Sequence, residues 1–266
     1  GLSFVVGNKN PIGDGVKHNM FDSIVGGFVG TNSGTIASSY VSNTSITSHA
    51  EEDDGKLAGF AGRNEKNGII TYSYVRGSDS VLSSTSVFNE GAVIQSTTDS
   101  RVAGFVHSNE GEINNSFANI ALKTTSKFLA GFVDNNYGRI TESYAAATMN
   151  GVKGGTDVSE RPFIGVNDLI KIQNYGNAVI DNCYYVMAKE SQTYPDELAY
   201  GLMPTAMGES KNLIGFVFVS GSVKASQDFG VWTYYTKTGM KTVLPELVSA
   251  NQIATSVRVP NAKSGI

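Results

Sequence analysis

Short apolar runs alternate with polar turns along most of the chain, and this alternation returns several times with nearly the same letters. The run LAGFVDNNYGRITESY at 129–144 shares half of its positions with VAGFVHSNEGEINNSF at 102–117. Each copy holds two short apolar segments on either side of an Asn-x-Gly turn. Neither segment has the 3.6-residue period of an amphipathic helix, so the pattern predicts short β-strands rather than helices.

The shared pattern reads G-F-V-x-x-N-x-G-x-I-x-x-S followed by Tyr or Phe. The clear copies begin at Gly27, Gly59, Gly104 and Gly131, and the second of them carries two extra residues at 65–66. A degenerate fifth copy is read through Gly165, Asn174, Gly176, Ile180, Cys183 and Tyr184. One unit cannot bury its own apolar residues, but units stacked about 4.8 Å apart would pair every backbone group with its neighbours. The sequence therefore predicts an all-β chain, a β-solenoid (β-helix).

Stacking places equal positions in columns, so each position of the pattern has an expected role. Interior ladders are predicted for Phe28, Phe60, Phe105 and Phe132 and for Ile36, Ile70, Ile113 and Ile140. The asparagines are expected to bond the turn and one another along the stack: Asn32, Asn64, Asn109 and Asn136. A turn with positive φ is expected at Gly34, Gly68, Gly111 and Gly138. A bend or a lumen position is expected for Ser39, Ser73, Ser116 and Ser143, and the side on which the following aromatic lies stays open.

Spacing and composition shifts divide the chain into three parts. Copies recur every 27 to 45 residues, which indicates three-sided coils whose spacers bulge outward as loops. The repeats are assigned to residues 1–186, a mixed α/β capping region over the last coil to 187–250, and a tail or linker to 251–266. Thr205 is the expected N-cap of a helix in the capping region.

Composition narrows the function classes. The formal charge is −4 and no Lys/Arg cluster is present, so no nucleic-acid partner is expected. No apolar run is long enough to cross a bilayer, so no membrane insertion is expected, and the start at Gly1 is read as a cut from a longer protein with flanking domains. The lone cysteine, Cys183, is read as a small buried apolar residue.

The repeat resembles the GLUG motif of bacterial surface proteins, with the likeness extending over about 27–247. The C-terminal part resembles the segment that follows such repeats at Gly201, Leu202, Met207, Phe216, Phe229, Trp232 and 244–247. Related repeats occur in haemagglutinin-like adhesins and in the N-terminal regions of immunoglobulin A1 metalloproteases. The resemblance implies a secreted or cell-surface β-solenoid and leaves its function open.

Few residues suggest catalysis, and no catalytic, cofactor-binding or metal site is assigned. The histidines are His18, His49 and His107, and no zinc-protease, serine-hydrolase or phosphate-loop motif is present. His107 and Asp134 share one pattern position in consecutive copies, so a His/Asp pair that orients a general base is one interpretation. A solvated pair on an outer face is the favoured alternative.

Acidic and aromatic residues give the other candidates. A solenoid polysaccharide enzyme would gather carboxylates on one face, but the acids fall at different pattern positions: Asp22, Glu112, Glu142, Asp157 and Asp181. The acidic run Glu51–Asp54 is favoured as a solvated spacer over a calcium site. Sugar-binding tyrosines would come from Tyr72, Tyr137, Tyr175, Tyr234 and Tyr235.

The favoured hypothesis is a non-catalytic, extracellular adhesin module that contacts a host protein or glycan through spacers 44–56 and 78–100. The alternatives are a substrate-recognition region of a secreted immunoglobulin-cleaving metalloprotease and a solenoid polysaccharide lyase or hydrolase. No cofactor is expected.

Overall fold

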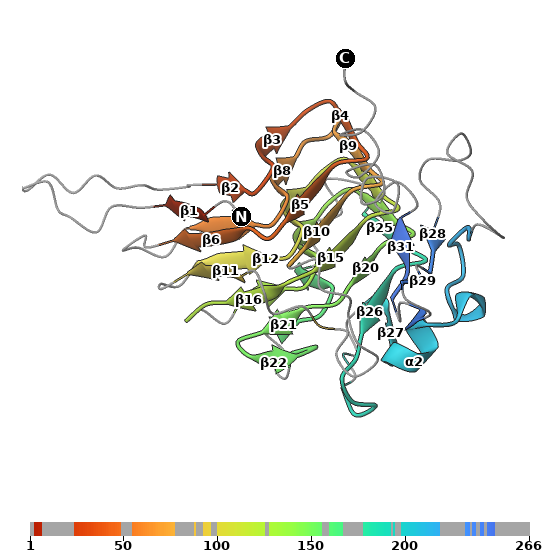
Figure 1. Cartoon of the computed structure of the whole chain (residues 1–266). Coiled ribbons are helices and arrows are strands. Elements are labelled where there is room, and N and C mark those ends of the chain that lie inside the picture. Colours follow the sequence, from red (N-terminus) through yellow and green to blue (C-terminus); the bar gives the residue numbers. More distant parts are fainter. Residues whose placement is uncertain are drawn as a thin grey trace, which may run out of the picture.

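The chain folds into a parallel β-solenoid whose strands are stacked in five sheets (Figure 1). A computed structural model describes residues 3–6, 24–48, 55–77, 88, 93–96, 100–125, 128–155, 160–166, 178–192, 194, 198–218, 232–234, 236–237, 240–241 and 244–247. The predicted all-β solenoid is confirmed. Among the described residues no helix is long and apolar enough to cross a membrane.

Each of the first four coils gives one strand to every sheet, and we name the sheets A to E. Sheet A contains β1 (Ser3–Val6), β6 (Ser45–Ser48), β11 (Val93–Ser96), β16 (Ala121–Lys123), β21 (Thr148–Met149) and the antiparallel β22 (Val152–Lys153). Sheet B contains β2 (Ile24–Gly26), β7 (Lys56–Ala58), β12 (Arg101–Ala103), β17 (Leu129–Ala130) and β23 (Glu160–Arg161). Sheet C contains β3 (Val29–Asn32), β8 (Ala61–Asn64), β13 (Val106–Asn109), β18 (Val133–Asn136) and β24 (Ile164–Val166).

The remaining two sheets complete the coil. Sheet D contains β4 (Thr35–Ala37), β9 (Ile69–Thr71), β14 (Glu112–Asn114), β19 (Arg139–Thr141) and β25 (Val179–Asp181). Sheet E contains β5 (Tyr40–Ser42), β10 (Tyr74–Arg76), β15 (Phe117–Asn119), β20 (Tyr144–Ala145), β26 (Tyr184–Val186) and β27 (Tyr200–Leu202). The chain runs through sheets B, C, D, E and A in each turn, so the prediction of three-sided coils is wrong. Coil 1 comprises β2–β6, coil 2 β7–β11, coil 3 β12–β16, coil 4 β17–β21 and coil 5 β23–β26.

The predicted ladders are confirmed as interior for coils 2 to 4, whereas in coil 1 Phe28 stacks on Phe60 but is 50% exposed and Ile36 is partly buried. The rings of Phe60, Phe105 and Phe132 are fully buried, and successive ring centroids lie 4.8 Å apart. The isoleucines of sheet D pair in register from coil to coil. Phe163 extends the Phe ladder at 4.8 Å from Phe132, so the fifth copy begins at Pro162 and its reading from Gly165 is wrong. Proline replaces glycine there, which hid the copy in the sequence.

The asparagine column is confirmed as a hydrogen-bonded ladder. Each Nδ2 donates to the Oδ1 of the asparagine in the next coil, at 2.8 Å for every described step. The turn glycines beside this column do not have positive φ, contrary to the prediction. They are needed because coils approach closely: a Cβ on Gly111 would lie 2.1 Å from Gly68 O, and one on Gly138 would lie 2.0 Å from Gly111 O.

A left-handed bend precedes the serine column and turns the next aromatic outward. Positive φ values of 44–52° occur in this column at Ser38, Tyr72, Asn115, Glu142 and Asn182. The serines lie at the bend, and three are fully buried: Ser73, Ser116 and Ser143. The following aromatics form a second stacked ladder, which includes Tyr40, Tyr74, Phe117 and Tyr144. This ladder packs with a cluster that is separate from the solenoid interior.

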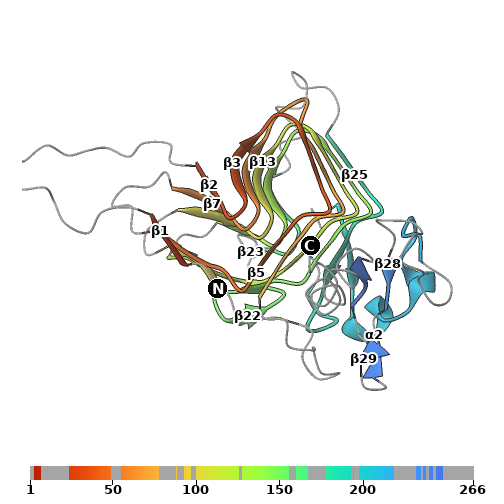
Figure 2. The same cartoon turned by 45° about the horizontal axis from the view of Figure 1, so that its top comes forward.

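The C-terminal region packs against this second ladder. Its elements are α2 (Pro204–Met207), the 3-10 helix η1 (Ser210–Asn212), β28 (Trp232–Thr233), β29 (Thr236–Lys237), β30 (Met240–Lys241) and β31 (Glu246–Leu247). Figures 1 and 2 show it beside sheet E. Among the described residues of the predicted capping region, β27 adds a strand to the end of sheet E and Met187, Tyr194 and Ala199 pack against the solenoid interior, while Met207, Leu213, Phe216 and Trp232 pack beside sheet E. The helical content is small, and the N-cap of α2 is Met203 rather than Thr205.

Candidate functional site

Sheets B and C meet at a corner that turns inward (Figure 2). This re-entrant corner holds a buried polar cluster of Arg101, His107, Asp134 and Asn135. Across the corner, a sheet B residue faces a sheet C residue of the next coil. The first such pair is Ile24 and Gly62, where a Cβ on the glycine would lie 2.2 Å from Ile24 Cγ2. The equivalent pair two coils later is Arg101 and Asp134. The corner thus changes from apolar to charged along the stack.

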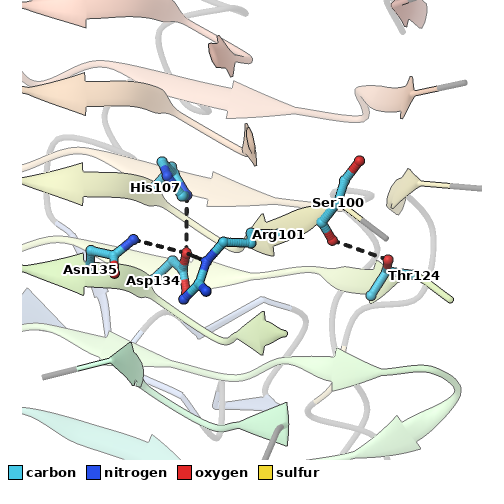
Figure 3. Close-up of polar contacts among 6 residues, drawn as sticks. All are labelled: Ser100, Arg101, His107, Thr124, Asp134 and Asn135. Carbon is cyan, nitrogen blue, oxygen red and sulfur yellow. Dashed lines mark hydrogen bonds and ion pairs between the residues drawn. The ribbon is translucent and has the colours of Figure 1, made fainter. Parts of the chain in front are cut away.

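Asp134 is the centre of the polar cluster (Figure 3). Arg101 donates to its carboxylate through Nε at 2.5 Å and through Nη2 at 2.8 Å. His107 Nδ1 lies 3.1 Å from Oδ2 without the geometry of a well-directed hydrogen bond, and Asn135 Nδ2 donates to the same oxygen at 3.1 Å. The Arg101 guanidinium also lies over the Phe128 ring, 4.5 Å from its centroid.

Burial and charge contacts act in opposite directions on the Asp134 carboxyl. Its side chain is 1% exposed, and burial alone would raise its pKa. The contacts with His107 and Arg101 outweigh burial, so the pKa is lowered below its ordinary value. The carboxylate is therefore ionised at neutral pH and already contacts three partners. The interpretation of His107 and Asp134 as a solvated outer pair is wrong, because both side chains are buried.

The same cluster makes stability depend on pH. Because the folded pKa of Asp134 is lowered, its contribution is present above the unfolded pKa of about 3.9 and is lost as pH falls through the folded pKa. We expect the free energy of unfolding to fall more steeply below about pH 4 in the native chain than in an Arg101→Ile/Asp134→Gly variant. Urea unfolding at pH 7, 5, 4 and 3 measures this difference. Parallel pH profiles would contradict the assignment.

The other predicted site residues that the structure describes are Tyr72, Tyr137, Tyr234, Glu112, Glu142 and Asp181. Among the tyrosines, Tyr72 and Tyr137 are half-buried and Tyr234 donates its hydroxyl to Met207 O at 2.6 Å. Glu112 lies in the Arg139 column of sheet D, and Asp181 lies in the Thr141 column. The described acids therefore occupy different columns, as the sequence predicted, with Glu142 in the bend column. Within the described ranges no three His, Cys, Asp or Glu residues form a metal-binding group.

Several candidates fall outside the described residues. These are His18, His49, Glu51–Asp54, Asp22, Asp157, Tyr175 and Tyr235. The capping-region residue Phe229 and the tail 251–266 also fall outside them.

Cys183 occupies the serine position of coil 5 and is fully buried. Burial raises the pKa of its thiol, which donates to Asp181 O at 3.3 Å. We expect the native chain to react with a thiol reagent at pH 8 only as fast as it unfolds. Cys183→Ser is expected to change stability by less than about 1 kcal/mol, because serine makes the equivalent bond in the other coils. The absorbance of the reagent measures the rate of the thiol reaction, and thermal unfolding measures the stability of Cys183→Ser. Rapid labelling of the thiol in the folded chain would contradict its burial.

Arg101 was not among the sequence candidates, although a signal was present. The copies at 56–60 and 101–105 read KLAGF and RVAGF, so both begin with a basic residue at the same position. From the sequence alone, a basic residue at this position could equally lie at the solvent-exposed end of a strand. The inward corner brings it opposite sheet C.

The extra residues at 65–66 are absorbed by the turn and leave the register intact. Asn64 pairs with Asn109 on one side of the turn, and Ile69 pairs with Glu112 on the other. The enlarged turn borders a shallow hollow of about 250 Å³ lined by Ser33, Arg63, Glu65, Lys66, Asn67 and Glu110. Arg63 and Glu110 form an ion pair across it. All of its lining residues are polar or charged.

The connections between sheets A and B form a second feature, which we name the connecting edge. They comprise 7–23, 49–55, 97–100, 124–128 and 154–159, so their lengths vary while the flanking strands keep register. The predicted spacers 44–56 and 78–100 are partly wrong, because β6 and β11 belong to the stack. Phe88 is buried in the cluster beside sheet E. The part of 44–56 that lies outside the strands is on the connecting edge.

Comparisons with known proteins give no relative. No protein family, no curated protein and no solved structure matches the chain.

Proposed function

We propose that this chain is a non-catalytic β-solenoid module of a bacterial surface or secreted protein, acting as an adhesin segment that binds a host protein or glycan. The observation that carries the proposal is the contrast between a stack in strict register and a connecting edge whose segments differ in length and composition. Loops on a rigid scaffold are where recognition residues concentrate. The resemblance of the repeat to GLUG motifs of surface proteins supports the same assignment and an extracellular location.

The chemistry of the corner supports a binding module rather than an enzyme. The Asp134 carboxylate is held by Arg101, His107 and Asn135, and its burial keeps it from a substrate. A general base must have a lone pair within hydrogen-bond reach of the proton it removes. We assign this cluster a structural role, which is to fill the inward corner that Ile24 fills against Gly62 earlier in the stack.

The proposal is tested by replacing residues 49–54 of the full chain with a Gly/Ser segment of equal length. The native chain is expected to bind at least one ligand on a glycan and host-protein array, and the replacement is expected to lose it while thermal unfolding stays the same. A matched control replaces residues 156–159, which connect sheets A and B just before coil 5. Loss of binding in the first variant alone indicates that the ligand contacts residues 49–54, whereas loss in both indicates a general effect of loop replacement. Retention of every ligand by both variants would contradict the connecting edge as the binding surface. Release of new reducing ends or unsaturated sugars from a polysaccharide panel would contradict a non-catalytic role.

A further inference from the structure

The turn between sheets C and D differs in coil 2 from the same turn in its neighbours (Figure 2). Coils 1, 3 and 4 make this turn with residues 32–34, 109–111 and 136–138, whereas coil 2 makes it with residues 64–68, which we call the enlarged turn. The strands on both sides of the enlarged turn pair in register with coils 1 and 3. The fold therefore does not need the two extra residues.

Hydrogen bonds hold the walls of the hollow beside the enlarged turn. Glu65 N donates to Asn32 O in coil 1 at 2.8 Å, and Gly68 N donates to Glu65 O at 2.6 Å, which closes the turn. On the other side of the hollow, Arg63 Nε donates to Glu110 Oε1 at 3.1 Å and fixes the direction of the guanidinium. Because these walls are in place before a ligand arrives, binding costs little ordering of the protein.

Four side chains that line the hollow have unused hydrogen-bonding groups. The side chains of Ser33, Glu65, Lys66 and Asn67 make no hydrogen bond or ion pair with any residue that the structure describes. The Ser33 hydroxyl and the Asn67 amide can each donate and accept, the Glu65 carboxylate accepts, and the Lys66 ammonium donates. The hollow thus presents donors and acceptors together around about 250 Å³.

The lining of the hollow selects the class of ligand. Arg63 and Lys66 each carry one positive charge and Glu65 and Glu110 each carry one negative charge, so the formal charge of the lining is zero. An anion would meet two carboxylates, and an apolar molecule would meet no apolar side chain. A metal ion would lack a third acidic or histidine ligand among the described residues. A neutral molecule with several hydroxyl groups can satisfy these donors and acceptors and leaves no charge unpaired.

We propose that the hollow binds one hexose ring at the end of a neutral glycan. Its volume of about 250 Å³ is below the range of about 300–1,000 Å³ for drug-sized ligands, so it fits one ring rather than an oligosaccharide. Hydroxyls of the ring donate to Glu65 and accept from Lys66, and Asn67 bonds a further hydroxyl. Because the hollow is shallow, we expect a millimolar affinity.

The test titrates the full chain, labelled with nitrogen-15, with the methyl glycosides of glucose, galactose and mannose. At least one of these probes is expected to shift the amide resonances of residues 65–68 and Glu110 in a saturable way. The decisive variant deletes Lys66 and Asn67, which leaves the Asn-Glu-Gly turn that coil 3 has at 109–111. We expect this variant to unfold at the same temperature as the native chain and to lose the saturable shifts.

Tyr137→Ser is the matched control, because it gives coil 4 the Asn-Ser-Gly turn of coil 1 at 32–34 and Tyr137 does not line the hollow. It is expected to bind the probe with native affinity. The hollow lies between sheets C and D, away from the connecting edge between sheets A and B, so it does not rest on the proposed function. The chain with residues 49–54 replaced is therefore expected to keep methyl glycoside binding, and the deletion variant is expected to keep ligands of the connecting edge.

Three results would overturn the inference. These are no saturable shift with any methyl glycoside up to about 0.1 M, which is far above a millimolar Kd, equal binding by the native chain and the deletion variant, and binding of the anionic sugar N-acetylneuraminate without binding of a neutral probe. If the deletion prevents folding, Lys66→Ala/Asn67→Ala keeps the length of the turn, and unchanged binding by this variant would count equally against the site.

Discussion

Replacing Trp232 with alanine is expected to destabilise the chain by about 3–5 kcal/mol, the usual range for a fully buried aromatic. The indole is 0% exposed and packs against Phe117, Tyr144 and Phe216, with ring centroids 6.2, 5.7 and 4.5 Å away. Its Nε1 also donates to Asn115 Oδ1 at 3.0 Å. Because Trp232 contacts coils 3 and 4 and the C-terminal region, its loss leaves a cavity where these parts meet.

Chemical unfolding measures this effect, and limited proteolysis locates it. We expect the C-terminal region to become sensitive to protease in Trp232→Ala before the repeats do. Val217→Ala is the matched control, since Val217 is 65% exposed in the same region, and it is expected to change stability by less than about 0.5 kcal/mol. Equal stability of Trp232→Ala and Val217→Ala would contradict the packing of this region on sheet E.

Replacing Asp134 with alanine is expected to cost about 3 kcal/mol, near the lower end for breaking a buried ion pair. The variant leaves the Arg101 guanidinium and His107 at the corner without the carboxylate that holds them at 2.5–3.1 Å. Arg101 remains 25% exposed, which lets water reach it and limits the loss.

A double variant separates loss of the ion pair from loss of packing. Arg101→Ile/Asp134→Gly copies the Ile24 and Gly62 pair that the first two coils use at the same corner. We expect it to recover at least half of the stability lost in Asp134→Ala, because no charge is left unpaired. Urea unfolding at pH 7 measures all three chains. A double variant less stable than Asp134→Ala would contradict the equivalence of the two pairs.

The interior of the fold was predictable because stacking makes it repeat in the sequence. Phe105 and Phe132 must fill the same space in consecutive coils, so they recur as letters at one spacing. Sheet A was harder to predict, because β6 and β11 share an Ile and a Ser in register but β16 and β21 do not keep this pattern. Their apolar contacts tolerate different residues, which is why five sides were read as three.

The packing of the C-terminal region on sheet E and the burial of the corner could not be predicted, because the repeat pattern does not show on which side of a strand each side chain lies. The left-handed residue before each serine turns the aromatic outward, so Tyr144 and Tyr184 needed a cover along the side of the stack. Their hydroxyls donate to Pro245 O and Ile214 O in that cover. The His107 and Asp134 contact followed from their shared column, but their burial depended on the inward corner and on Arg101 from sheet B.

Disulfide trapping tests the central claim, the parallel in-register stack, most directly. In a Cys183→Ser background, Thr71→Cys/Asn114→Cys joins two positions that pair in sheet D, about 4.8 Å apart and within disulfide reach. The control Thr71→Cys/Thr141→Cys spans two coils, about 9.6 Å, which is beyond that reach. The account predicts rapid disulfide formation in the first pair and none in the folded control, read by mass spectrometry under mild oxidation. Failure of the first pair to close, or equal closure of both, would contradict it.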